Sequence, residues 1–254
     1  MLDSTPGNVY IIKSKLFSLY PALRFGISTK QGGVGIAPFD FNLSYNVCDE
    51  EKSVLQNRRI FYRALNIPED RVIKPKQVHG DAVLEVSSAG GSVECDGLVT
   101  NVPDLYLAIT IADCVPVFLF DPVHQCVAAV HAGWRGTHLN IVRNAVINMA
   151  DSFRSTPADI KCYIGPCADV CCYEVGQDVA ELFHAQYVVH RQEKKFINFK
   201  KMIKDSLSVM GVPESSIEIS ASCTICGSSL FHSYRREGKN SGRMMGMIGL
   251  RGTE

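Results

Sequence analysis

Two short segments carry the residue types best suited to chemistry: Cys114, in Ala-Asp-Cys-Val-Pro, and His131, in His-Ala-Gly-Trp-Arg-Gly. The β-branched and aromatic residues between them predict two strands joined by a turn at residues 121–125. A turn centred near residue 123 places Cys114 opposite His131 or Ala132 in the antiparallel pair. Directly opposed Cβ atoms lie about 4.5–5.5 Å apart. A thiolate and an imidazole at that separation can bind one metal ion.

A catalytic zinc site needs a third ligand, and His79 is the candidate. It ends an expected strand just before Gly80. Three protein ligands with the fourth position open is the arrangement that activates a bound water. Four other histidines are expected to be ordinary hydrogen-bonded core or surface residues: His124, His138, His184 and His190.

Two other readings of the cysteines stay open. A Cys114–His131 pair is also the arrangement of a thiol hydrolase without a metal. Cys223 and Cys226 have the C-x2-C spacing of a structural zinc site, to which Cys167 with Cys171 or Cys172 could add two ligands. Packed thiols are the simpler expectation for these residues.

Both strands and helices are predicted around these residues. Segments rich in β-branched and aromatic residues predict strands at residues 9–12, 24–29, 105–111, 115–120, 126–131, 160–164, 217–219 and 245–250. Helical spacing of apolar residues predicts a helix capped by Asp49 and running to about Asn66, one carrying Leu139, Val142, Val146 and Met149, and others near residues 177–185 and 199–210. This pattern predicts an α+β layered fold with central mixed sheets flanked by helices.

The amino-acid composition argues against several classes of protein. Of the 254 residues, 46% are apolar, which is enough for a sizeable core and argues against disorder. The 26 basic and 26 acidic residues cancel, so we expect no nucleic-acid or membrane partner. Apolar runs are too short to span a bilayer, and residues 1–13 lack a signal-peptide pattern. We expect a single cytoplasmic domain over residues 1–254, a monomer or weak homo-oligomer, with its ten cysteines reduced.

Several segments together resemble those of the laccase-domain, or multicopper polyphenol oxidase, family, also called YfiH-like: QVHGD, CDGLVT, IADCVPV, HAGWRGT, IGPC…CYEVG and SYRREG…SGR, in that order. The resemblance implies a single-domain zinc protein with a layered fold related to cytotoxic-factor-like cysteine hydrolases. It maps the zinc ligands onto His79, Cys114 and His131. It also implies phosphorolysis of adenosine, inosine and methylthioadenosine, together with adenosine deamination.

Deamination would need a carboxylate that moves a proton from the zinc-bound water to the leaving amine. The candidates are Asp113, Asp96 and Glu174. Regular strand alternation would turn Asp113 away from Cys114 and leave it only to orient the loop. Asp113 is therefore expected either in catalysis, with Cys114 and His131, or in holding the backbone.

Phosphorolysis would need a cation that holds phosphate. Arg135 lies four residues after His131 at the entry to a helix, whose N-terminus adds N–H donors. Arg58, Lys30 and Arg243 are further candidates, each with an ordinary surface role as the alternative.

Some members of the family that the sequence resembles are described as copper-dependent laccases acting on phenols. Two histidines and one cysteine also resemble a blue-copper ligand set, and copper binds such donors more tightly than zinc. However, the chain has seven histidines and no His-x-His pair, which argues against a multicopper centre. We therefore expect zinc, with copper as the alternative, and a purine nucleoside with phosphate as the small-molecule substrates.

Overall fold

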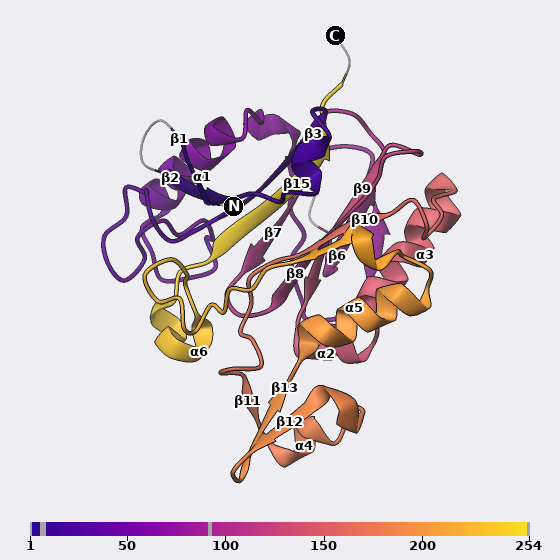
Figure 1. The fold of residues 1–254 in the computed structure, drawn as a ribbon. Coiled ribbons are helices and arrows are strands. Elements are labelled where there is room, and N and C mark those ends of the chain that lie inside the picture. Colours follow the sequence, from indigo (N-terminus) through magenta and orange to yellow (C-terminus); the bar gives the residue numbers. More distant parts are fainter. Residues whose placement is uncertain (1, 6–8, 91–92, 253–254) are drawn as a thin grey trace.

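Two six-stranded sheets packed face to face make the centre of the computed structural model, which describes residues 2–5, 9–90 and 93–252 (Figure 1). In spatial order, the first sheet contains β1 (Leu2–Thr5), β2 (Val9–Ile12), β3 (Leu23–Ser28), β15 (Met244–Leu250), β7 (Tyr106–Ile111) and β4 (Val72–Ile73). The second contains β14 (Ile217–Ile219), β10 (Lys161–Ile164), β8 (Val115–Asp121), β9 (Cys126–Ala132), β6 (Gly97–Thr100) and β5 (Val83–Glu85). Both sheets are mixed, with one parallel pair in the first and two in the second.

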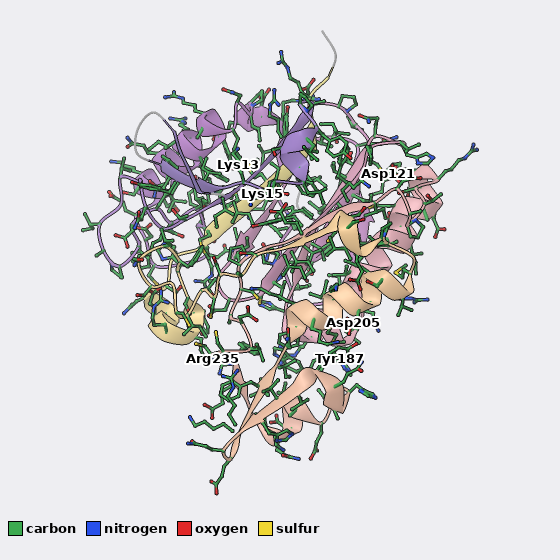
Figure 2. All side chains as sticks on the ribbon, in the orientation of Figure 1. Lys13, Lys15, Asp121, Tyr187, Asp205 and Arg235 are labelled. Carbon is green, nitrogen blue, oxygen red and sulfur yellow. The ribbon has the colours of Figure 1, made fainter. Side chains whose placement is uncertain are left out.

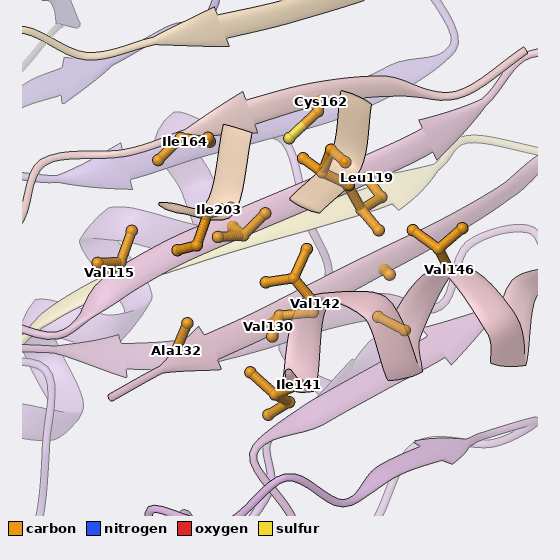
Figure 3. Close-up of a cluster of buried hydrophobic side chains, with 14 of the residues drawn as sticks. Val115, Leu119, Val130, Ala132, Ile141, Val142, Val146, Cys162, Ile164 and Ile203 are labelled. Atoms are coloured by element: carbon orange, nitrogen blue, oxygen red, sulfur yellow. The ribbon is translucent and has the colours of Figure 1, made fainter. Parts of the chain in front are cut away.

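Helices cover the outer faces of both sheets. Helix α1 (Glu51–Ala64) packs on the first sheet. Helices α3 (Ile141–Phe153) and α5 (Phe199–Val209) pack on the second, where Val142 and Ile203 meet the side chains of β8 and β9 (Figure 3). The order of layers is therefore helix, sheet, sheet, helix.

Short elements complete the chain. A small sheet of β11 (Glu174–Val175), β13 (Lys194–Ile197) and β12 (Val188–Arg191) projects from the two main sheets with α4 (Gln177–Ala180) (Figure 1). Helix α2 (Trp134–His138) follows β9, and helix α6 (Tyr234–Glu237) lies shortly before β15. None of the helices in the described ranges is long and apolar enough to cross a membrane.

Strand alternation explains why both faces of each sheet are buried. In β8, Val117 and Leu119 face α3 and α5, whereas Phe118 and Phe120 fill the space between the sheets. Burying one such side chain stabilises the fold by about 1.5–3 kcal/mol. The sequence of a strand with two buried faces is a continuous run of apolar residues, as at residues 115–120.

The predicted α+β class is confirmed, and two predicted strands, at residues 9–12 and 217–219, have the observed bounds. Other predictions need correction. Asp49 does not cap α1, because its carboxylate accepts from the backbone N–H of Glu50 and from Asn42 while Glu50 takes the cap position. Leu139 lies outside α3, because the left-handed backbone of Asn140 separates α2 from α3. The helix predicted at residues 177–185 ends at Ala180.

The hairpin register also differs from the prediction. Pro116 pairs with His131 and Val115 with Ala132, so Cys114 lies just before β8 and opposite neither. Asp121 pairs with Cys126 and accepts N–H bonds from the turn, which places four residues in the turn and moves its centre along the chain. The predicted register was therefore wrong by one or two positions.

Candidate metal centre and cavity

A cavity of about 620 Å³ opens where β7 and β8 meet and where β9 passes into α2. His79, Cys114 and His131 lie in its wall. Cations and aromatic rings from α2, α5, α6 and neighbouring loops complete it: Lys74, Arg135, Arg235, Arg243, Trp134, Tyr173, Phe199 and Tyr234. The cavity is thus lined by groups suited to an anion and a flat apolar ring.

The side chains of His79, Cys114 and His131 meet although they come from three separate segments. Their candidate ligand atoms all lie within 4.8 Å of one another, and the two imidazole rings pack edge to face with centroids 5.0 Å apart. His131 is the penultimate residue of β9. His79 was predicted to end a strand. The structure places it in a loop instead, with a left-handed φ of 60°.

Gly133 makes room for this approach. A Cβ atom on Gly133 would lie 3.2 Å from Cδ2 of His79 and 3.4 Å from Sγ of Cys114. Any larger residue would therefore press on two of the three candidate ligands.

Asp96 holds both histidines in place. Its Oδ1 accepts a hydrogen bond from Nδ1 of His131 at 2.7 Å, and its Oδ2 accepts the backbone N–H groups of Val78 and Gly80, on either side of His79. The carboxylate is fully buried. A carboxylate on Nδ1 fixes the tautomer of an imidazole and leaves Nε2 free to bind a metal.

The charges of Cys114 and His131 support each other. Burial alone would raise the pKa of Cys114, but the imidazoles of His131 and His79 lower it to about 6. Burial would lower the pKa of His131, but the Cys114 thiolate and Asp96 raise it to about 9. Two imidazole nitrogens and a readily formed thiolate are donors that zinc and copper both accept, so these residues fit a metal ion.

Asp113 is anchored by the protein itself. Its carboxylate accepts the hydroxyls of Thr224 at 2.6 Å and Ser233 at 3.0 Å, and the backbone N–H of Arg235 at 2.7 Å. Its own backbone is left-handed, with φ of 84°. Strand alternation therefore does not apply at this residue, and its observed contacts are those of a residue that orients the loop before Cys114.

The predicted cations differ in location. Arg135 lines the cavity at the start of α2 and stacks on Trp134, with Cζ 4.6 Å from the ring centroid. Lys30 and Arg58 are not among the described lining residues: Lys30 pairs with Asp40 at 3.7 Å, and Arg58 donates to the carbonyl of Leu43. Both side chains therefore contact the loop beside α1 and not the cavity.

Two further cations line the cavity and were not predicted from the sequence: Arg235 and Lys74. Arg235 extends from α6 toward β11, stacks on Tyr173 and donates to the carbonyl of Glu174 (Figure 2). Burial lowers the pKa of Lys74. The carboxylate of Glu174, predicted as a proton carrier, instead pairs with Lys194 at 2.8 Å. The segment Ser-Tyr-Arg-Arg-Glu-Gly was visible in the sequence, but only the fold brings it beside Asp113.

A layered α+β fold that brings two histidines and a cysteine together beside cations and aromatic rings is typical of a metal-binding protein. Residues 24–251 match the family described as multi-copper polyphenol oxidoreductase laccase, and the chain belongs to this family. It is 33% identical to "Purine nucleoside phosphorylase YlmD" of Bacillus subtilis strain 168, over 89% of this chain and 88% of that protein. It is also 33% identical to "Purine nucleoside phosphorylase" of Bacteroides thetaiotaomicron, over 91% and 93%.

Solved structures agree with this assignment. The crystal structure of Bacillus licheniformis hypothetical protein YfiH superposes with a TM-score of 0.90 at 32% identity, covering 98% of this chain and 99% of that one. YlmD from Geobacillus stearothermophilus gives a TM-score of 0.90 at 30% identity, covering 98% of both chains. The fold is therefore that of the YfiH and YlmD proteins.

Proposed function

We propose that this protein is a zinc-dependent purine nucleoside enzyme that phosphorolyses adenosine, inosine and methylthioadenosine and also deaminates adenosine. The observation that carries the proposal is the cavity that combines His79, Cys114 and His131 with cations and aromatic rings. The names of the relatives, purine nucleoside phosphorylase, support the substrate class. We place it in the cytoplasm as one catalytic domain, monomeric or weakly self-associating.

In this proposal His79, Cys114 and His131 hold the metal. A bound zinc ion would supply Lewis acidity and an activated water. Arg135, with Arg235 and Arg243 nearby, binds phosphate, because a guanidinium matches two phosphate oxygens at once. Trp134 lies against Arg135 in the same wall, where its ring can pack the turn or stack on the base.

The phosphorolysis itself exchanges one bond for another. A phosphate oxygen bonds to C1′ of the sugar while the bond from C1′ to N9 breaks, and the purine leaves with that electron pair and takes up a proton. The products are free base and sugar 1-phosphate. Cations that hold phosphate beside C1′ act by positioning and by charge stabilisation.

A second candidate function is a Cys-His hydrolase. Cys114, His131 and Asp96 follow one another as thiol, imidazole and carboxylate, and the pKa of Cys114 is lowered to about 6 because the two imidazoles outweigh the effect of burial. A thiolate activated in this way is a nucleophile for amide or ester carbonyls. A copper-dependent oxidase remains the alternative that the family description raises.

The test combines metal analysis with product chromatography. Protein purified without added metal is assayed with adenosine, inosine and methylthioadenosine, each with and without phosphate. We expect zinc rather than copper, base and sugar phosphate only when phosphate is present, and slow inosine formation from adenosine alone. Cys114→Ala should lose both activities, while Cys48→Ala, at an exposed cysteine, should keep them. Absence of phosphate-dependent base release with all three nucleosides would overturn the proposal and favour the hydrolase or the oxidase.

A further inference from the structure

A second group of sulfur atoms lies outside the candidate metal centre. The Sγ atoms of Cys171, Cys172, Cys223 and Cys226 all lie within 4.8 Å of one another. Sγ of Cys226 is 3.1 Å from that of Cys172 and 3.6 Å from that of Cys171. The four residues come in two pairs from loops about fifty positions apart in the sequence, so the fold, not chain proximity, brings the pairs together.

The spacing of the sulfurs suits one tetrahedral ion. With zinc–sulfur bonds of about 2.3 Å, tetrahedral geometry puts neighbouring sulfurs about 3.8 Å apart. Sulfurs that are all within 4.8 Å of one another need only small shifts to reach this value. An iron–sulfur cluster has further metal and sulfide atoms between its cysteine ligands, and this group has no room for them.

The backbone around Cys223 prepares a thiolate. The backbone N–H groups of Asp169, Ile225 and Cys226 point at Sγ of Cys223. The bond from Asp169 measures 3.5 Å. N–H groups from the second and third residues after the first cysteine of a C-x2-C turn stabilise a thiolate when it binds a metal.

Two guanidinium groups bond to the loops that carry the four cysteines, and one of them, that of Arg236, is also paired with Glu237 at 2.7 Å. Four thiolates around a divalent ion carry a net charge of −2. The guanidinium of Arg236 donates to the carbonyls of Thr224 and Ile225 within the C-x2-C turn, at 2.7 and 2.8 Å. The guanidinium of Arg191 donates to the carbonyl of Cys171 at 3.0 Å.

We propose that Cys171, Cys172, Cys223 and Cys226 bind one structural zinc ion, separate from the metal ion proposed at Cys114. The sequence had suggested Cys167 as a member, which the structure corrects. Cys167 is buried, and its sulfur is not one of the four that lie within 4.8 Å of one another. It contributes instead a backbone bridge to Cys223.

The ion would join two loops that form the wall of the cavity. Ala168 and Tyr173 flank one cysteine pair and line the cavity. Thr224, inside the C-x2-C turn, donates to Asp113, whose carboxylate also holds the start of α6. A metal at this place would fix both loops against each other and thereby keep Asp113 and Arg235 in position.

The experiment counts metal ions in the full-length protein and its variants. Wild-type protein should bind two equivalents of zinc, whereas Cys171→Ser/Cys226→Ser and Cys114→Ala should each bind one. Both Cys171 and Cys226 are exposed, so the double variant should fold, which circular dichroism checks. Cys48→Ser, at another exposed cysteine, is the matched control and should keep both ions.

Cobalt substitution gives a second readout. With Cys114→Ala protein, one cobalt ion should produce a strong thiolate charge-transfer band, and the band should disappear in the triple variant Cys114→Ala/Cys171→Ser/Cys226→Ser. One zinc equivalent in wild-type protein that the double serine variant retains would overturn the proposal. A mass lower by two hydrogens in non-reduced protein, traced to Cys172 and Cys226, would also overturn it, because the thiols would then form a disulfide. Neither outcome bears on the nucleoside assay, so failure of one proposal is distinguishable from failure of the other.

Discussion

Asp96 connects the two histidines of the candidate centre to the rest of the fold. It touches His131 through one carboxylate oxygen and the backbone on both sides of His79 through the other. Removing its charge leaves the three proposed ligands in the chain but loosens their orientation. Asp96 is therefore a positioning residue, whose effect appears in the affinity for metal.

We expect Asp96→Asn to weaken zinc binding about 10- to 100-fold, because partners of this kind contribute that much to metal sites. Competition with a zinc-binding dye measures the affinity. Asp178→Asn, at an exposed residue of α4, is the control and should leave affinity unchanged. Equal affinities for wild-type and Asp96→Asn protein would mean that this carboxylate does not support the metal.

Arg135 permits a second test at the level of one residue. We expect Arg135→Lys to keep zinc content and fold but to raise the KM for phosphate about tenfold, because a lysine cannot form the paired contacts of a guanidinium. Steady-state kinetics with varied phosphate checks this. Arg143→Lys, on the exposed side of α3, should behave like wild type. An unchanged phosphate dependence in Arg135→Lys would assign Arg135 to packing against Trp134.

Cys114 and His131 were predicted partly from residue types and spacing and partly from the resemblance to a known family. The residue types and the hairpin were predictable, because the apolar strands and the turn residues are local signals. The contact between these two side chains and His79 depends on the left-handed backbone at Asp113 and His79, which no sequence pattern predicts. Left-handed residues other than glycine persist where surrounding contacts hold them, and at Asp113 those contacts come from residues more than a hundred positions away.

Helix α6 is a short element whose hydrogen bonds hold one side of the cavity. Glu237 at its end bonds Arg236 at 2.7 Å and accepts the N–H of Ser233. Burial alone would raise the pKa of Glu237, but the His232 ring and the Arg236 guanidinium lower it to about 2. Because the folded pKa lies below the unfolded value, the ionised carboxylate stabilises the fold above about pH 4.5, and this contribution is lost as the pH falls toward 2.

We therefore expect Glu237→Gln to be less stable than wild type near neutral pH and to approach wild-type stability as the pH falls toward about 3. Urea unfolding at a series of pH values measures the difference in the free energy of unfolding. Glu193→Gln, at an exposed position, should show no such convergence. A difference that stays constant over this range would show that the charge of Glu237 does not stabilise α6.

Elements with strong periodicity were predictable within one or two residues, and short elements were not. The strands of the central hairpin and helix α5 follow from apolar runs and helical spacing. Helices α2 and α4 have five and four residues, too few to show a period. Their place is decided by tertiary contacts, which is why residues 177–185 were read as one longer helix.

The order of strands in the first sheet depends on pairs that are distant in the sequence. Strand β15, near the C-terminus, lies between β3 and β7. The sequence predicts β3, β7 and β15 as strands but not this order, because pairing between distant strands leaves no local pattern. The layered class could be predicted, whereas the neighbours of β15 could not.

The two sheets contact each other closely at Gly246 and Phe118. Gly246 of β15 faces Phe118 of β8, and a Cβ atom at residue 246 would overlap the end of that ring. We expect Gly246→Ala to cost about 1–3 kcal/mol through overpacking and Phe118→Ala to cost about 3–5 kcal/mol through the cavity it leaves. The new methyl group partly fills that cavity, so the double variant should lose less than the two single losses combined, by about 0.5–3 kcal/mol. Urea unfolding measures all four proteins, and Phe118→Ala combined with Val123→Ala, at an exposed turn residue, should be additive. Strictly additive losses for the Gly246 and Phe118 pair would show that the sheets do not pack through this contact.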